Sequence, residues 1–184
     1  MNRAFLLALA LLFAFDHAAG RAVQEQAAPH IGVMHVQTLP PFYYFHTGFE
    51  TDFKSMTEPL RKAIPALFKA AGEGKVPIRG PVMHLYYDSP HLQPDKRFKM
   101  ETGVAVSEDS KPAGAFKVRQ TARFKCATIL YTGPGKRIGD AWQRLAQAVR
   151  AAGLEPTGEE RELYLYWEAE DSPNNIVQAQ LGVR

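Results

Sequence analysis

The chain has 184 residues, of which 46% are hydrophobic and 22% are charged, and its formal net charge is +3. This composition excludes a disordered chain and a membrane-embedded bundle, and the small, interspersed positive surplus argues against nucleic-acid binding. The single cysteine, Cys126, excludes an intramolecular disulfide framework, a cysteine-based zinc site and a Cys-x-x-Cys redox pair. Cys126 lies in an apolar stretch typical of a strand. We therefore expect a buried small side chain there, with a reactive thiol as the alternative.

The chain begins with the pattern of an export signal. An uninterrupted apolar run of 12 residues, Ala4–Phe15, follows the positive charge of Arg3, and polar and then small residues lead from it to Gly20. This pattern predicts a signal peptide over residues 1–20, because the run is too short to cross a hydrocarbon core of about 30 Å as a helix. We expect a disordered mature N-terminus over residues 21–29 and a periplasmic or secreted protein. An uncleaved anchor is the alternative.

Two segments with helical periodicity stand among segments with strand character. The first helix is expected over residues 60–71, with Gly72 as its stop and Pro65 as a bend or break. The second is expected over residues 138–152, where apolar residues are spaced by four and three, and Gly153 ends it. The expected strands cover residues 31–37, 44–48, 81–87, 99–106, 116–121, 124–130, 161–167 and 176–183.

The order strand, strand, helix, strand, strand occurs twice along the chain. The pairs Thr47-Gly48 and Thr132-Gly133 end corresponding strands, which indicates a duplication with repeat one over residues 30–97 and repeat two over residues 98–184. Each half has only one helix to cover its strands, so we expect one domain over residues 30–184 rather than two. The predicted fold is α+β: an antiparallel sheet with two helices and pseudo-twofold symmetry.

The second half carries an ordered set of motifs. These are Tyr131-Thr132-Gly133-Pro134-Gly135, a helix centred on Ala141-Trp142, a glycine at position 153, and Glu162-Leu163-Tyr164 on a strand. The segment from Phe116 to the end resembles the GyrI-like small-molecule-binding family, the effector-binding domain of AraC- and MerR-type multidrug regulators, which is related to SOUL haem-binding proteins. The resemblance implies a cleft for hydrophobic or cationic compounds, and Glu162 matches the family glutamate. The chain departs from the usual members in its predicted signal peptide and in having no helix-turn-helix segment.

Candidate ligand-binding residues lie on two strands that the duplication aligns. Side chains alternate along a strand, so Glu162, Tyr164 and Tyr166 share one face of residues 161–167. The opposite face is expected to pack under the helices, and it carries Leu163, Leu165 and Trp167. The duplication aligns Glu162 with His84 and Tyr164 with Tyr86, which brings two polar–aromatic pairs toward one cleft between the repeats.

Two further aromatic residues are candidates for the same cleft. Trp142 lies on the apolar stripe of the second helix, where core packing is the simplest interpretation, and Tyr44 lies near the end of an early strand. Aromatic walls around one carboxylate suit a flat, apolar, often cationic ligand, because rings attract cations and the carboxylate compensates the charge. We expect burial among aromatic rings to raise the pKa of Glu162. The alternative is a solvated Glu162 beside a Tyr164 that belongs to the ordinary core.

The primary hypothesis is an exported, stand-alone domain that binds a hydrophobic or cationic small molecule. The first alternative is a hydrolase of strained small molecules that uses Glu162 and Tyr164, as the resemblance implies for some family members. The second is a protein- or envelope-interaction module, because a basic stripe could contact an anionic surface or partner. That stripe consists of Lys117, Arg119, Arg123 and Lys125, and a solvated basic strand face is its simplest interpretation.

The sequence predicts no metal site and no bound cofactor. The histidines after residue 20 show no helical pair spacing and no accompanying carboxylate cluster. The relation to SOUL proteins keeps a haem site as an alternative, with His84 as its ligand. The oligomeric state and the identity of the ligand are not predictable from the residues.

Overall fold

The computed structural model describes residues 28–184. The predicted signal peptide, and the predicted disordered N-terminus up to residue 27, lie outside the described residues. Neither of the two helices within residues 28–184 is both long enough and apolar enough to span a membrane.

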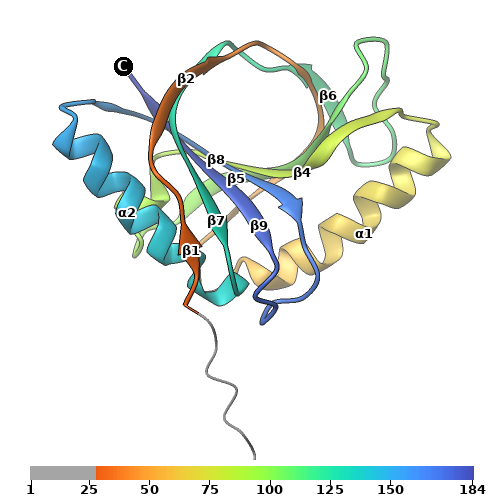
Figure 1. Ribbon diagram of the computed structural model, residues 1–184. Helices are drawn as coiled ribbons and strands as arrows, with labels where there is room; N and C mark the ends of the chain where they lie inside the picture. Colours follow the sequence, from red (N-terminus) through yellow and green to blue (C-terminus); the bar gives the residue numbers. More distant parts are fainter. Residues whose placement is uncertain (1–27) are drawn as a thin grey trace, which may run out of the picture.

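The described chain forms one large antiparallel sheet with two helices, which confirms the predicted α+β class (Figure 1). The elements in chain order are β1 (His30–Ile31), β2 (His35–Leu39), β3 (Tyr43–Thr51), α1 (Thr57–Glu73), β4 (Ile78–Tyr86), the short 3-10 helix η1 (Pro90–Leu92), β5 (Phe98–Val106), β6 (Lys117–Gln120), β7 (Phe124–Thr132), the 3-10 turn η2 (Gly135–Arg137), α2 (Ile138–Ala151), β8 (Pro156–Tyr166) and β9 (Ile176–Val183).

The strand order is symmetric about the centre of the sheet. It runs β1-β7-β9-β8-β4-β5-β3-β6, with β2 also paired to β7, so β7-β9-β8 on one side mirrors β3-β5-β4 on the other. Helix α1 connects β3 to β4, and α2 connects β7 to β8, at equivalent places in the two halves. At the centre, His84 of β4 lies opposite Glu162 of β8. This order agrees with two repeats, although the duplication itself stays a prediction.

Helix α1 runs without interruption from Thr57 to Glu73, so the expectation that Pro65 breaks it is wrong. A proline inside a helix removes one backbone hydrogen bond. Here Leu60 before it and Leu67 after it are both buried, and this packing on both sides of Pro65 keeps the helix continuous. The helix also continues through Gly72, and its cap is Gly74.

Helix α2 ends as its sequence predicts. Gly153 has a φ of 67°, and the Leu154 and Gly153 N–H groups donate to the carbonyls of Val149 and Arg150 at 3.1 and 3.0 Å. This pair of bonds is a Schellman motif, which satisfies the last free carbonyls of a helix and requires a residue that tolerates a left-handed conformation.

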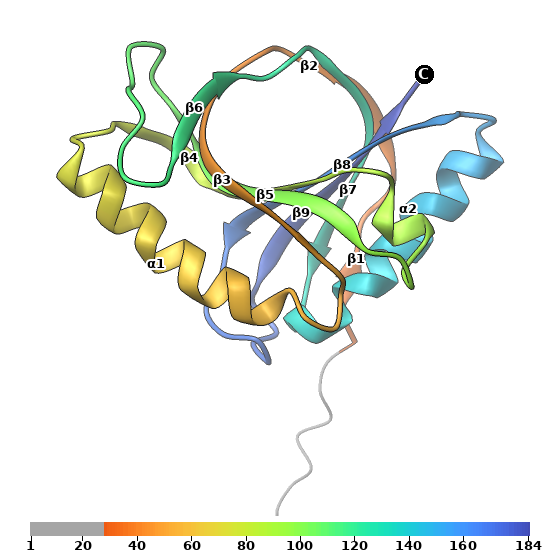
Figure 2. The ribbon, with the colours of Figure 1, turned by 180° about the vertical axis from the view of Figure 1, so that it is seen from behind.

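Both helices cover the same face of the sheet, while β2 and β6 curl toward each other beyond the opposite face (Figures 1 and 2). The helix-covered face holds clusters in which α2 packs on β7 and β9 and α1 packs on β3 and β5. The opposite face holds a separate cluster, whose members include Tyr44, Met83, Leu85 and Leu163.

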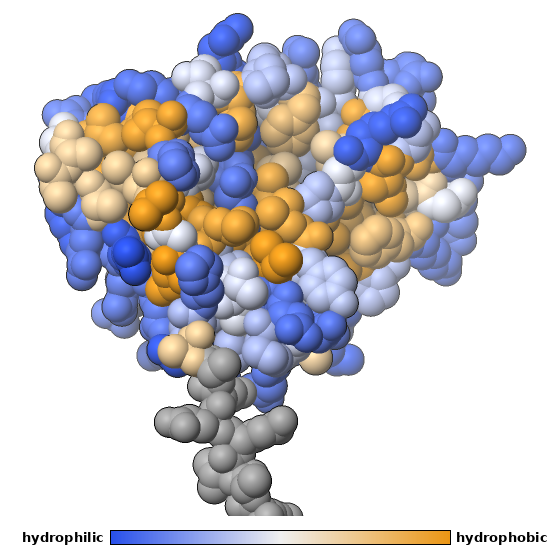
Figure 3. Space-filling model, viewed as in Figure 1, coloured by the Kyte–Doolittle hydropathy of each residue, from blue (hydrophilic) through white to orange (hydrophobic). Residues whose placement is uncertain are grey.

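This arrangement overturns the predicted faces of β8. Tyr164 packs against the α2 cluster, whereas Leu163 packs on the opposite face, so the side that carries Glu162 lies under the helices. Leu165 stays 48% exposed. On the side of the molecule seen in Figure 3, hydrophobic residues form a patch across the middle of the surface. Alternation alone shows which residues share a face, but not which face the helices cover.

Candidate functional site

A cavity of about 940 Å³ opens on the helix-covered face of the sheet, where α1 and α2 stand apart. Strands β4 and β8 form its floor through His84, Tyr86, Glu162 and Tyr164. Both helices contribute walls, and the segment around η1 contributes His91. The cavity exists because each half of the sheet has its own helix, and the central strand pair lies between the two.

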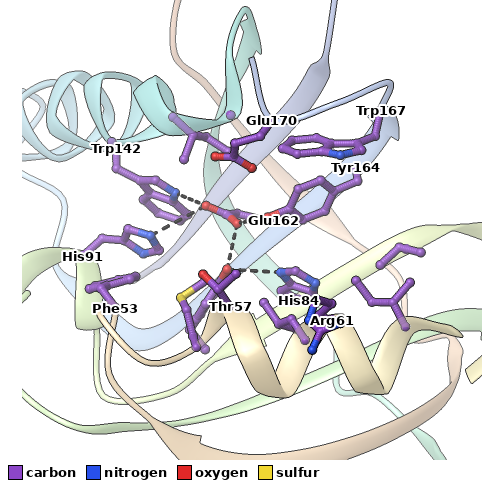
Figure 4. A pocket seen from close by; sticks show the side chains of 18 of the residues that line it. Phe53, Thr57, Arg61, His84, His91, Trp142, Glu162, Tyr164, Trp167 and Glu170 are labelled. Atoms are coloured by element: carbon purple, nitrogen blue, oxygen red, sulfur yellow. Dashed lines mark hydrogen bonds and ion pairs between the residues drawn. The ribbon is translucent and has the colours of Figure 1, made fainter. Parts of the chain in front are cut away.

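Glu162 is the buried centre of this cavity (Figure 4). Its Oε1 accepts a hydrogen bond of 2.6 Å from the indole Nε1 of Trp142. Its Oε2 accepts hydrogen bonds of 2.7 Å from the hydroxyls of both Tyr86 and Tyr164. Three donors from α2, β4 and β8 therefore converge on one carboxylate, and hydrogen bonds to an ionised group are the stronger kind.

These contacts reverse the expected pKa shift of Glu162. Burial by itself raises the pKa of this carboxyl, but the neighbouring His91 and His84 rings and the hydrogen bonds from Trp142 and Tyr86 outweigh it, and the pKa lies below its usual value. The sequence predicts burial correctly but does not reveal the donors, which come from distant parts of the chain. A lowered pKa favours the ionised form of Glu162 at neutral pH.

His84 is buried beside this carboxylate and is neutral at neutral pH, because burial lowers its pKa to about 4. Its Nδ1 lies 3.3 Å from the Tyr86 hydroxyl. That hydroxyl donates its proton to Glu162, so the hydrogen-bond network assigns the His84 proton to Nδ1. The His84 Nε2 is buried without a hydrogen-bond partner. Burial also raises the pKa of both Tyr86 and Tyr164, which keeps their hydroxyls protonated as donors.

His91 is a residue of this site that the sequence pattern does not reveal. Its Nδ1 lies 2.6 Å from Oε2 of Glu160, and its Nε2 lies 3.6 Å from Oε1 of Glu162. The ring stacks on Trp142 with a centroid distance of 3.9 Å and an angle of 9° between the planes. His91 belongs to a polar segment near the end of predicted repeat one, and nothing in its local pattern distinguishes it from an ordinary loop histidine.

Trp167 and Glu170 form the outer part of the cavity on the side of β8. Trp167 meets the Tyr164 ring edge-on at a centroid distance of 5.3 Å, and Figure 4 shows Glu170 between Trp142 and Trp167. A β-bulge shifts the β8–β9 register between Tyr164 and Tyr166. A bulge changes the face on which later residues lie. This is why Trp167 lies on the cavity although simple alternation assigns it to the other face.

Two predicted site residues do not line the cavity. Tyr166 is 48% exposed and donates to Glu168, because the same bulge turns it away from the face of Tyr164. Tyr44 is buried on the opposite face of the sheet, where its hydroxyl donates to the Met83 carbonyl at 2.8 Å. The other predicted candidates do line it: His84, Tyr86, Trp142, Glu162 and Tyr164.

The residues of the basic stripe are not equivalent. Lys117, Arg123 and Lys125 are exposed. Arg119 instead donates to Glu101 at 2.6 Å and to the Tyr87 hydroxyl at 2.8 Å. Residues 28–184 contain no group of three or more His, Cys, Asp or Glu side chains placed to hold a metal ion.

Known structures share this fold. The chain superposes with a TM-score of 0.70 on the crystal structure of the EcmrR C-terminal domain, at 21% identity, with 83% of this chain and 98% of that chain covered. SAV2435 bound to tetraphenylphosphonium gives a TM-score of 0.58 at 12% identity, covering 83% and 94%. A hydrolase from Listeria innocua gives a TM-score of 0.56 at 13% identity, covering 82% and 91%. Identities this low establish the fold alone.

Sequence comparison places the chain in a family. A comparison with curated proteins gave no match. The sequence model of the GyrI-like small molecule binding domain, however, matches residues 33–179, which include both helices, the central strand pair and every residue of the Glu162 network. This confirms the resemblance found in the motifs of the second half and extends it to the first. The chain therefore belongs to the GyrI-like small molecule binding domain family.

Proposed function

We propose that the cavity binds an aromatic, cationic small molecule and that Glu162 supplies the opposite charge. The observation that carries this proposal is a buried, ionised carboxylate on the floor of an open cavity. Among the described residues its ion-pair partner is His91, and no lysine or arginine pairs with it. A buried carboxylate with no permanent counter-ion attracts a cation from solution.

The walls suit the apolar part of such a ligand. Tyr86, Trp142, Tyr164 and Trp167 line the cavity together with Phe53, and aromatic faces attract cations as well as flat rings. A volume of about 940 Å³ lies within the range of pockets for drug-sized ligands. SAV2435, which shares the fold, has a structure bound to tetraphenylphosphonium, a cation with four aromatic rings.

Binding agrees better with the geometry than hydrolysis by Glu162 and Tyr164. The carboxyl has a pKa below its usual value, and burial raises the pKa of the Tyr164 hydroxyl, so each group keeps its ordinary protonation state near neutral pH. A general acid or base works best when its pKa lies near the working pH. The same two groups are well suited to holding a cation and a ring.

Isothermal titration calorimetry with tetraphenylphosphonium tests the proposal. We expect saturable binding by the unmodified protein and a loss of roughly 30-fold or more in affinity for Glu162→Gln, because one partner of a buried charge pair is removed. The matched control is Glu155→Gln, which removes an exposed carboxylate that lies 3.8 Å from Arg184 and does not line the cavity. Binding that Glu162→Gln leaves unchanged contradicts the proposal.

We further propose that the protein binds its ligand outside the cytoplasm, because residues 1–20 have the pattern of a signal peptide. The mass of the protein recovered from the periplasmic fraction of its own cells checks this point. A mass that begins near residue 21 supports export, and a cytoplasmic protein with residues 1–20 intact contradicts it.

A further inference from the structure

We propose that His91 determines which ligand charge the cavity accepts. When His91 is neutral, the charge of Glu162 is available to a cationic ligand. When His91 is protonated, it takes the place of that cation beside Glu162, and the cavity then prefers uncharged ligands. This inference rests on the proposed function, and it adds a proton-dependent choice of ligand that the Glu162 carboxylate by itself does not provide.

The contacts of Glu160 determine where the His91 proton lies. Glu160 is fully buried, and its Oε2 accepts from the His91 backbone N–H at 3.2 Å and lies 2.6 Å from Nδ1 of the same residue. Its Oε1 has no hydrogen-bond partner. With Oε2 of Glu160 as the acceptor of both bonds, Nδ1 carries the proton of the neutral ring and Nε2 carries the lone pair. A second proton is therefore added at Nε2.

That second proton is added next to Glu162, the group proposed to hold the ligand. The His91 Nε2 lies 3.6 Å from Oε1 of Glu162, the same oxygen that accepts from Trp142. The imidazolium would stand between the carboxylates of Glu160 and Glu162, and it would repel a ligand cation drawn to Glu162. The His91 side chain is 10% exposed and lines the cavity, so solvent protons and ligand reach the same place.

The backbone holds His91 in this position. Asp88 and Ser89 both have left-handed φ angles, 68° and 49°, which are uncommon for residues other than glycine. The Ser89 N–H donates to the carbonyl of Gly158 at 2.9 Å, which fastens the start of η1 to β8. Stacking on Trp142 then places the imidazole ring parallel to the indole. Strained residues of this kind persist where the surrounding contacts over-determine the conformation.

The titratable and aromatic groups that face His91 come from every element packed against it. Glu160 and Glu162 come from β8, His84 and Tyr86 from β4, Trp142 from α2, and Phe53 from the loop before α1. The pKa of Glu162 lies below its usual value, that of His84 is about 4, and that of Tyr86 is raised by burial. Arg61 and Glu170 stand at the exposed rim. Histidine is the side chain that ordinarily changes charge between pH 5 and 8.

The test compares a charged and an uncharged probe of similar shape, tetraphenylphosphonium and triphenylphosphine oxide, by calorimetry at about pH 7.5 and about pH 5.5. In the unmodified protein we expect the affinity for the cation to fall on the order of tenfold at the lower pH, and that for the neutral probe to change by less than about twofold. His91→Gln and His91→Phe should bind the cation equally at both pH values. His91→Phe keeps a ring that can stack on Trp142. The control is His35→Gln, which replaces an exposed histidine of β2 and should retain the pH dependence of the unmodified protein.

The possible results separate the two proposals. Binding that depends on Glu162 but is independent of pH, or a pH dependence that both His91 variants retain, overturns the role of His91 alone. No binding of either probe at any pH overturns the proposed function as well. Should both variants fail to fold, NMR of the labelled histidine ring decides. Saturating tetraphenylphosphonium must shift His91 toward its neutral form, because linkage between proton and cation is reciprocal, and an unshifted ring contradicts the proposal.

Discussion

The indole Nε1 of Trp142 donates a 2.6 Å hydrogen bond to Oε1 of Glu162 and thereby ties helix α2 to the central strand β8. The carboxylate is buried and also accepts bonds from two tyrosine hydroxyls. Burial raises its pKa, but the neighbouring His91 and His84 and the bonds from Trp142 and Tyr86 outweigh it and hold the pKa below its usual value. Trp142 also belongs to the apolar cluster under α2. The same side chain is therefore part of the hydrophobic core, a wall of the cavity and a donor to its charge.

Trp142→Phe should lower the free energy of unfolding by about 1.5–3 kcal/mol, because it removes a hydrogen bond to a buried charged group. Urea denaturation measures this change. The matched control is Trp167→Phe, in which a 40% exposed indole is replaced, and it should cost less than about 1 kcal/mol. Equal losses for the two variants would show that the bond to Glu162 contributes nothing to stability.

Stability should decrease as the pH falls from 6.5 toward about 4, because native His84 has a pKa of about 4 and the unfolded histidine binds a proton near 6.5. The unfolded state binds more protons in this window, so the free energy of unfolding rises with pH there, by up to about 3 kcal/mol. Glu162, whose pKa is lowered, acts in the same direction at more acidic pH.

Urea denaturation at a series of pH values checks this dependence. His84→Gln should flatten the curve between pH 6.5 and about 4, and the exposed His35→Gln should leave it unchanged. A curve that His84→Gln leaves as steep as before contradicts the assignment of this proton uptake to His84.

Gly135→Ala should move the outer wall of the cavity. A Cβ at Gly135 would overlap the Cη2 atom of the Trp167 ring, so the exposed indole must shift. Loss of one aromatic contact should weaken tetraphenylphosphonium binding by about twofold to fivefold. Gly72→Ala is the control, because its Cβ meets no atom within 4 Å and Gly72 does not line the cavity, so this variant should bind normally. Identical affinities of the two variants would exclude Trp167 from the binding surface.

Tyr44→Phe should separate stability from ligand binding. It removes the buried hydrogen bond to the Met83 carbonyl at a cost of about 1 kcal/mol, but this bond lies on the face of the sheet opposite the cavity. We expect calorimetry with tetraphenylphosphonium to give an unchanged affinity for Tyr44→Phe and a reduced one for Tyr164→Phe. A reduction of the same size in both variants contradicts the assignment of the two tyrosines to different faces.

Cys126 should be inert in the folded protein. The side chain is fully buried, and burial raises the pKa of its thiol to about 11, so little thiolate forms at about pH 8. Ellman's reagent should react with this thiol in denaturant and only slowly in buffer. Fast reaction of the native protein would show that the strand β7 opens readily.

Local periodicity by itself determines much of the fold. A short stretch of residues is enough to predict the spacing of apolar residues in α2, the glycine at its end and the strand at 176–183. The structure confirms all three. The motif order also identifies the family, which its sequence model confirms. Five of the candidate site residues line the cavity. Four of them lie on β4 and β8, where alternate residues share a face wherever the strand is placed, and the fifth, Trp142, lies on the apolar stripe of α2.

Only the tertiary structure decided which groups surround Glu162. The pairing of β4 with β8 brings His84 and Tyr86 to it, α2 brings Trp142, and the loop after β4 brings His91. No local pattern records these contacts, because they depend on strand register, a bulge and the placement of helices across long sequence separations. For the same reason the sequence alone led to the wrong direction for the pKa of Glu162: burial is a property of residue type and periodicity, whereas the donors that outweigh it are a property of the assembled fold.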